Sequence, residues 1–163
     1  MDKRMRKVSG GEDFSNMLAG LTGDQALIVM KKACFAGAGV LADALKSEIQ
    51  NLPEESGYMK PGKKRNVVGT NDKKMLQERL GVSRIEATGD RATVAVSFSG
   101  YNDRPTKKYP HGVPIPLIAR SIESGSSVRV KNPFIRRTFN RVRSEAQDAA
   151  VQAGQTAIND LIK

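Results

Sequence analysis

The chain has no tryptophan, five phenylalanines and three tyrosines, so aromatic residues make up 5% of its 163 residues. A hydrophobic core must therefore come mainly from Leu, Ile, Val, Met and Ala, and the many Ala and Gly residues bury little apolar area each. We expect a core this thin to gain stability from surface that is buried in an oligomer. The length suits one domain better than two.

The chain has one cysteine, Cys34, and one histidine, His111. A lone cysteine cannot form an internal disulfide, which is typical of proteins in a reducing compartment. These two residues cannot supply the nitrogen and sulfur ligands of a zinc site within one chain. The sequence also has no glycine-rich phosphate loop and no nucleophile elbow. We therefore expect no enzymatic activity, no cofactor and no metal ion.

Long apolar runs are also scarce. No apolar run is expected to reach transmembrane length, and the charged first seven residues lead into Ser and Gly rather than into the apolar core of a signal peptide. The sequence thus predicts a protein that is made in the cytoplasm and has no membrane partner.

Positive charge is abundant: 27 Lys and Arg against 17 Asp and Glu give a formal net charge of +10. An excess of this size favours acidic partners, either nucleic acid or acidic protein surfaces. Two groups of basic residues are the candidate contacts for assembly or for DNA. The first lies in a loop (Lys60, Lys63, Lys64 and Arg65), and the second surrounds the start of the last helix (Arg129, Lys131, Arg136, Arg137 and Arg141).

The second basic group has more than one interpretation. It is either a solvated helix surface or a surface that contacts DNA phosphates or an acidic neighbour, because Arg bonds phosphate and carboxylate equally well. Sequence-specific recognition is not expected. The chain shows no helix-turn-helix or zinc-finger pattern, and it has few aromatics on which bases would stack.

Hydrophobic spacing predicts two long helices, at about 24–52 and 133–162. The first contains Gly37 and Gly39, which weaken a helix and therefore indicate that another backbone approaches closely. Pro53 should end it. The pair Asn132-Pro133 predicts the start of the second helix, with Asn132 as the cap.

Between the helices, alternating apolar residues predict an antiparallel hairpin of 82–88 and 92–98 around the turn Gly89-Asp90. Short helices are expected near 72–80 and 115–124, and a short strand at 128–130. The predicted fold is α+β: two long helices packed on a small antiparallel β-sheet, with long basic loops. Residues 1–23 are predicted to be a flexible basic arm with a short helix, and 24–163 a single α+β domain.

Several short motifs occur in a recognisable order. Gly100-Tyr101-Asn102 is followed by Gly112-Val113-Pro114, and then by an acidic residue before a Gly-Ser turn and a Pro-Phe pair that opens the last helix; the matching residues are Glu123, Gly125, Ser126, Pro133 and Phe134. This order resembles the tail-component family of long-tailed bacteriophages, the gene-product-ten-like group of lambdoid phages. The resemblance covers about residues 24–160. It is weaker after Pro53, where the family has a Pro-x-x-Thr-Gly loop. Here Ser56-Gly57 stands in place of Thr-Gly, one residue further on.

The resemblance implies a structural virion protein of the head–tail junction, a neck or tail-completion component that is assembled in the host cytoplasm. Its expected partners are further copies of itself in a ring (a hexamer, with a dodecamer as the alternative), neighbouring neck, connector and tail-tube proteins, and genomic DNA passing through the channel without sequence specificity. No catalysis is implied. Two alternatives stay open: a tail-terminator or stopper ring of the same junction, and a sequence-independent DNA-binding protein.

Overall fold

The computed structural model describes residues 20–21, 23–56, 64–88 and 91–162. The predicted arm at 1–23 lies almost wholly outside these residues, and so do Lys60 and Lys63 of the predicted basic loop.

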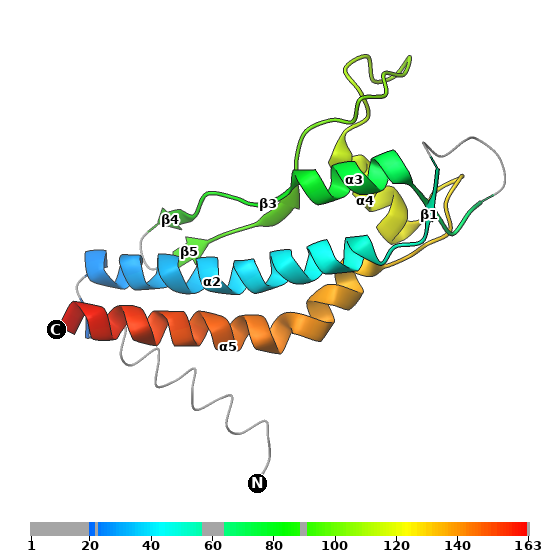
Figure 1. The fold of residues 1–163 in the computed structure, drawn as a ribbon. Helices are drawn as coiled ribbons and strands as arrows, with labels where there is room; N and C mark the ends of the chain where they lie inside the picture. Colours follow the sequence, from blue (N-terminus) through cyan, green and yellow to red (C-terminus); the bar gives the residue numbers. More distant parts are fainter. Residues whose placement is uncertain (1–19, 22, 57–63, 89–90, 163) are drawn as a thin grey trace, which may run out of the picture. The chain divides into compact units, whose positions relative to one another are not determined.

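The described chain forms two long helices, two short ones and three pairs of short strands (Figure 1). The long helices are α2 (Gly23–Gln50) and α5 (Phe134–Ile162), and the short ones are α3 (Thr70–Arg79) and α4 (Ile115–Ser124). The strands are β1 (Glu54–Glu55), β2 (Val68–Gly69), β3 (Leu80–Val82), β4 (Glu86–Thr88), β5 (Arg91–Thr93) and β6 (Val96–Phe98). The α+β class, the two long helices and the antiparallel strands confirm the sequence prediction.

The chain divides into two compact units that are built from alternating stretches of sequence. Unit 1 comprises the described residues of Met1–Val40, Val82–Ala95 and Arg143–Lys163, and unit 2 comprises Leu41–Gly81 and Val96–Val142. Each long helix contributes one part to each unit. The prediction of a single domain over 24–163 stays a prediction.

In unit 1 the first part of α2 packs against the second part of α5. Val29, Ala157 and Ile158 form a small buried cluster there. A Cβ atom added at Gly37 would lie 2.9 Å from the carbonyl oxygen of Ala146, so the two helix backbones approach as closely as the glycine suggested. Gly39 has no heavy atom within 4 Å of an added Cβ, and its predicted role in a close approach was wrong.

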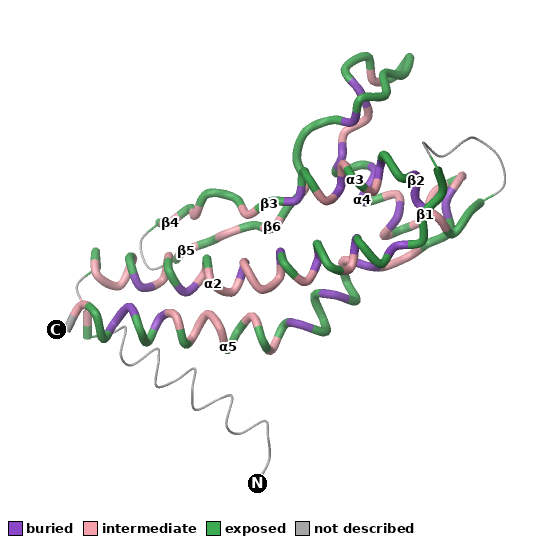
Figure 2. Tube along the Cα trace, in the orientation of Figure 1, coloured by how far each residue is buried: buried purple, intermediate pink, exposed green. Residues whose placement is uncertain are grey.

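Unit 1 also contains the tip of the predicted hairpin. Strands β4 and β5 pair antiparallel, with Glu86 opposite Thr93 and Thr88 opposite Arg91. Alternate residues of β5 and of the residues after it are half-buried and exposed, as the period-two pattern predicted (Figure 2). The Cys34 thiol on α2 lies 3.6 Å from the carbonyl oxygen of Ala92, and its burial raises the pKa of the thiol.

Unit 2 holds the larger core, to which four helices contribute. Phe134 at the start of α5 is fully buried, and it belongs to the same cluster as Ile49 of α2, Leu76 of α3 and Ile115 of α4. The amphipathic α4 turns Ile118, Ala119 and Ile122 into this core. A core made largely of Leu, Ile, Val and Ala, with one phenylalanine at its centre, agrees with the low aromatic content.

Two features of unit 2 differ from the sequence prediction. Strands β1 and β2 pair in parallel, with Glu54 opposite Val68, although only antiparallel pairing was expected. The expected strand at 128–130 is a single bridge between Arg129 and Arg65. The bridge joins residues that are 64 positions apart in the sequence, and a strand of two residues is too short to show a periodic pattern.

Helix α2 corrects one further expectation. By length and composition it is long and apolar enough to cross a membrane, although no run of that kind was expected. It is the one such helix in the described part of the chain. Interior helices of soluble proteins meet the same criterion, so this alone is weak evidence for a membrane.

A basic unit with a built loop as the candidate interface

The motif residues that carry the family resemblance form one connection between α4 and α5. The Glu123 carboxylate accepts hydrogen bonds from the backbone N–H groups of Ile135 (2.8 Å) and Arg136 (3.3 Å). Glu123 thus caps the first turn of α5 from a distance, and its negative charge faces the positive end of the helix dipole. Asn132 was the predicted cap, and that prediction was wrong: its side-chain oxygen accepts from the Arg137 guanidinium instead.

The Gly-Ser turn of the motif closes this connection. Gly125 has φ +79°, and an added Cβ would lie 3.1 Å from the backbone nitrogen of Lys131. The position therefore favours glycine both for its backbone conformation and for the close approach of the chain at Lys131. The Ser126 hydroxyl accepts from the N–H groups of Val128 and Arg129. Acid, glycine, serine and the buried Phe134 therefore act together to set where α5 begins.

Arg129 is not a surface residue, which corrects its place among the candidate contacts. It is 6% exposed, and its guanidinium donates to the Asp72 carboxylate of α3 at 2.6 Å. One carboxylate oxygen of Asp72 and one guanidinium nitrogen of Arg129 are buried without a hydrogen-bond partner among the described atoms. A buried ion pair fixes the geometry of its surroundings but is weak evidence of net stabilisation.

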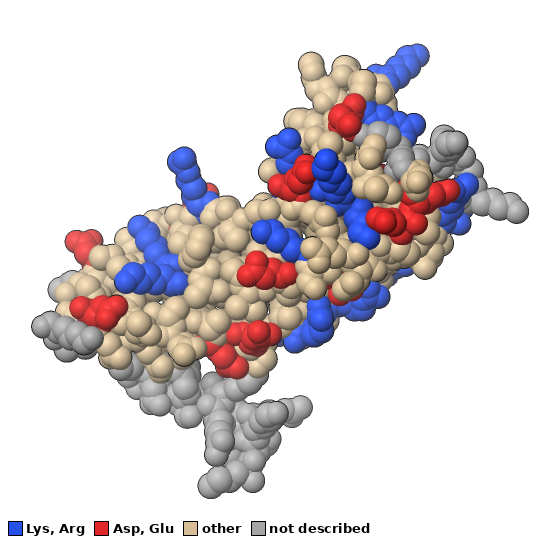
Figure 3. Space-filling model, viewed as in Figure 1, with Lys and Arg blue, Asp and Glu red and all other residues tan. Residues whose placement is uncertain are grey.

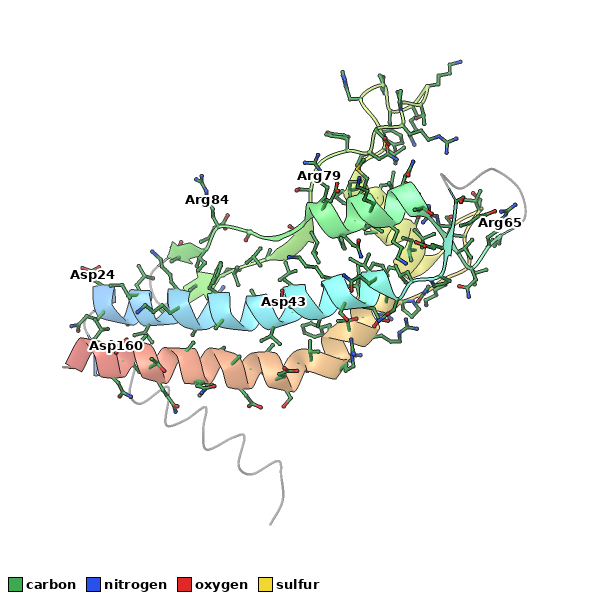
Figure 4. The ribbon with its side chains drawn as sticks, viewed as in Figure 1. Asp24, Asp43, Arg65, Arg79, Arg84 and Asp160 are labelled. Atoms are coloured by element: carbon green, nitrogen blue, oxygen red, sulfur yellow. The ribbon has the colours of Figure 1, made fainter. Side chains whose placement is uncertain are left out.

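Arg65 is bound within the chain as well. Its backbone bridges the segment around Arg129, donating to Val128 and accepting from Val130. Its guanidinium is bonded to the exposed Glu55 of β1, and this carboxylate raises the pKa of Arg65. Figure 4 labels Arg65 beside the strand that Figure 1 labels β1. Arg65 therefore anchors the end of the basic loop. Of the predicted loop residues, Lys64 is described and exposed.

The remaining basic candidates lie exposed at the start of α5 or just before it. Glu48 of α2 pairs with both Arg137 (3.0 Å) and Arg141 (3.4 Å), whose side chains stay more than half exposed. Lys131 and Arg136 are exposed too. The sequence thus placed four arginines in one group, and the structure gives them three situations: buried with Asp72, shared with Glu48, and exposed.

A second exposed basic feature was not among the candidates: the loop that joins β6 to α4, drawn at the top of Figure 1. Its base is held by Asn102, whose backbone N–H donates to the Val113 carbonyl oxygen at 2.9 Å and whose side-chain oxygen accepts from the Val113 N–H at 2.7 Å. Gly112 has φ +99°, and an added Cβ would lie 1.9 Å from the Asn102 carbonyl oxygen. Near the tip, Thr106 and Tyr109 exchange two backbone hydrogen bonds.

This loop carries Lys107 and Lys108 between those two hydrogen-bonded residues, and both lysines are exposed. The Lys108 ammonium lies 5.5 Å from the centre of the Tyr109 ring, within the range of a cation–π contact. Figure 3 shows basic side chains at the end of the loop. The Lys-Lys pair between prolines was the sequence signal that could have identified it.

The net positive charge of the described residues lies in unit 2. The described residues of unit 2 contain 15 Lys and Arg and 8 Asp and Glu, a difference of +7, whereas those of unit 1 contain 5 and 5, a difference of 0. Unit 2 is therefore basic, and unit 1 is neutral by residue count.

Unit 2 also contains a hollow of about 260 Å³ beside the base of the basic loop. Its walls mix apolar side chains with the buried ion pair, and the lining includes Asp72, Arg129, Asn102, Val113, Leu117 and Ile118. Within the described residues no group of three or more His, Cys, Asp or Glu side chains is arranged to hold a metal ion. Comparisons with protein-family models, with curated proteins and with solved structures gave no match for this chain.

Proposed function

We propose that the protein is a structural component of the bacteriophage head–tail junction, a neck or tail-completion protein that forms a ring around the DNA channel. The observation that carries the proposal is the division of charge: the described residues of unit 2 have a net charge of +7, and those of unit 1 have a net charge of 0. A ring around DNA needs one basic surface toward the phosphates and other surfaces for its neighbours, and such a division of charge supplies both.

The motif geometry supports the same proposal. Glu123, Gly125, Ser126 and Phe134 each have a distinct structural task in positioning α5. Their order in the sequence is thus explained by one connection rather than by chance spacing. These contacts are the structural roles of the motif residues in this chain, and the family resemblance rests on their order in the sequence.

Within this proposal the loop at 102–112 is the part that faces DNA. Lys107 and Lys108 are exposed, and the tip is stiffened by hydrogen bonds, so little conformational entropy is lost when phosphates bind. Lys64 contributes from the neighbouring loop if that loop faces the channel as well. Contacts of this kind neutralise phosphate charge and read no bases.

The first test is the mass of the purified protein in solution, alone and with the phage's neighbouring neck and tail-tube proteins. Six copies of a 17.7 kDa chain have a mass of about 106 kDa. A ring-sized species in either setting supports the proposal, and imaging that species decides between six and twelve copies. A chain that stays monomeric in both settings contradicts it.

The rival function, sequence-independent DNA binding by the monomer, is favoured by the same excess of charge. It predicts tight duplex binding whose logarithm falls steeply and linearly with the logarithm of salt concentration, whereas a ring component should bind free DNA weakly. The informative variant pair is Lys107→Ala with Lys108→Ala, matched by Lys32→Ala with Arg84→Ala in unit 1. The loop pair should lower the salt slope by about 2, and the control pair should leave it unchanged.

The role of the basic loop at 60–65 is better tested by substitution than by deletion. Arg65 anchors a backbone bridge and bonds Glu55, so deleting it would disturb unit 2 itself. Replacing Lys60, Lys63 and Lys64 with Ala removes charge and keeps Arg65. We expect this variant to fold normally and to fail in head–tail joining, and normal particles would count against a role for these lysines.

A further inference from the structure

The hollow of unit 2 is lined by both the loop at 102–112 and α4, and the proposed function leaves it unused. Its volume is about 260 Å³, whereas one ordered water occupies about 30 Å³, so a single bound water would not fill it. Arg104 and Thr106 of the loop and Leu117 of α4 line the hollow and are exposed. All of its lining residues belong to unit 2. A ligand can therefore reach the hollow from solvent within one compact unit.

Most of the lining favours an apolar ligand body. Aliphatic side chains come from the end of the loop, from α4 and from the segment before α5; they are Val113, Leu117, Ile118 and Val128. Leu117 is 38% exposed, so a ligand that covers it removes apolar surface from water. The hollow thus has a hydrophobic gain to offer beside a loop that carries positive charge.

Two hydroxyl groups give the apolar hollow a polar edge. The Ser121 hydroxyl donates to the Ile118 carbonyl oxygen at 2.8 Å, which leaves its lone pairs to accept a hydrogen bond. The Ser126 oxygen accepts from the backbone N–H groups of Val128 and Arg129, which leaves its hydrogen to donate. An acceptor and a donor in an apolar hollow suit the edge of a nucleobase, which carries donors and acceptors side by side.

The charges of the lining orient such a ligand. Asp72 and Arg129 form the buried part of the lining, and because they are paired they attract no phosphate. Arg104 lies at the exposed side, and Lys107 and Lys108 follow it in the same loop. Lys107 is three residues beyond Arg104, so their Cα atoms are at most about 11 Å apart. The base of a nucleotide would therefore lie inside the hollow and its phosphate at the loop.

We propose that the hollow binds a nucleotide, with the base inside and the phosphate held by the basic loop. The inference rests on the DNA contact that the proposed function gives to this loop, and it names the form of DNA that the loop prefers. Bases of a duplex are paired and stacked, so only a free nucleotide or an unpaired strand places a base in the hollow. Phosphate contacts alone would favour the duplex, which has the higher charge density.

The test measures binding of DNA to the full chain in low salt by fluorescence anisotropy. The ligands are an unpaired strand of about eight nucleotides and a duplex of the same length. We expect the strand to bind about 10-fold more tightly than the duplex. Deoxynucleoside monophosphates should displace the strand, and inorganic phosphate at the same concentration should not. In NMR spectra the backbone N–H signals of Ser121 and Ser126 should shift with the mononucleotides and not with phosphate.

A matched pair of variants separates the hollow from the charge of the loop. Ser121→Leu fills the hollow and removes its acceptor, whereas Ser124→Leu makes the same change at an exposed position of α4 outside the hollow. Ser121→Leu should weaken strand binding about 10-fold and leave duplex binding unchanged. Ser124→Leu should change neither. Circular dichroism checks the fold of both variants, and if Ser121→Leu does not fold, the NMR shifts of the unchanged chain decide the inference.

The outcomes for the hollow and for the proposed function are distinct. Equal affinity for strand and duplex, or a strand preference that survives in Ser121→Leu, overturns the inference and leaves the proposed function to the mass of the assembly. A chain that forms no ring-sized species but prefers the strand supports the inference and contradicts the proposed function. Mononucleotides that bind as tightly as the strand assign the hollow to free nucleotides, and tighter binding of the strand assigns it to unpaired DNA.

Discussion

Gly37 and Gly39 of α2 give the sharpest test of the helix packing in unit 1, because an added side chain would meet α5 at Gly37 and nothing at Gly39. In Gly37→Ala the new Cβ would lie 2.9 Å from the Ala146 carbonyl oxygen and 3.3 Å from the Ala150 side chain. A backbone oxygen cannot move aside as a flexible side chain can. In Gly39→Ala the new Cβ meets no heavy atom within 4 Å.

The magnitudes follow from these distances. Alanine is about 1 kcal/mol more favourable than glycine in a helix interior, and both variants gain that much. Gly37→Ala also overpacks a close helix contact, which costs about 1–3 kcal/mol. Gly39→Ala should therefore raise the free energy of unfolding by about 1 kcal/mol, and the two variants should differ by about 1–3 kcal/mol.

Urea denaturation, followed by the circular dichroism of the helices, measures this difference. The urea midpoint of Gly39→Ala should lie above that of the unchanged chain. The midpoint of Gly37→Ala should lie below that of Gly39→Ala, and the slope of the transition should be the same for both variants. A thermal scan should separate the two variants by about 2–4 °C for each kcal/mol. Equal midpoints would refute the reasoning, because they would mean that α2 and α5 do not approach each other at Gly37.

Three further outcomes follow from the contacts. Glu123→Ala removes the cap of α5 and should lower the free energy of unfolding, measured by urea denaturation, by about 1–2 kcal/mol. The control Glu145→Ala, at an exposed position of the same helix, should change that free energy by less than about 0.5 kcal/mol. Asp72→Ala leaves a buried charge unpaired and should cost about 3–5 kcal/mol, and combining it with Arg129→Met should recover part of that loss; a double variant less stable than the single one contradicts this. Because burial raises the pKa of the Cys34 thiol, its alkylation by iodoacetamide should need a higher pH in the native chain than in urea, and identical pH profiles would show that the thiol is solvated.

The long-range pattern of the sequence was sufficient for the helices and for the hairpin. The apolar spacing of α2 and α5 persists over many turns, and the alternation before and after Gly89-Asp90 persists over several residues on each side. Signals of that length survive tertiary packing. The bounds of α4 were also predicted closely, because Pro114 and Pro116 mark its start and Gly125 its end.

The sequence was insufficient where a single contact decides. Asn132 and Glu123 are both able to cap α5, and local spacing favoured Asn132 because it directly precedes the helix. The structure gives the cap to Glu123, nine residues earlier than Asn132, because the turn at Gly125 folds α4 back on the start of α5. A remote cap of this kind has no local signal.

The basic residues show the same limit in electrostatic terms. Arg129 and Arg136 look alike in the sequence, as two members of one run that lacks acids. The partner of Arg129 is Asp72, 57 residues earlier, so its charge is neutralised inside unit 2 and does not contribute a phosphate contact. Arg136 forms no ion pair with another described residue and remains exposed.

A charge run is therefore a poor measure of the number of contacts it can make. Of the five basic candidates around the start of α5, Arg129 is buried, and Arg137 and Arg141 share Glu48, so Lys131 and Arg136 are the two whose charge is wholly available. A DNA-binding surface made from this run alone would have a salt slope near 2 rather than near 5. The loop with Lys107 and Lys108 offers a similar number of charges in a stiffer frame, and it does so without a carboxylate bonded to them. That difference is why the loop, rather than the start of α5, is assigned to DNA in the proposed function.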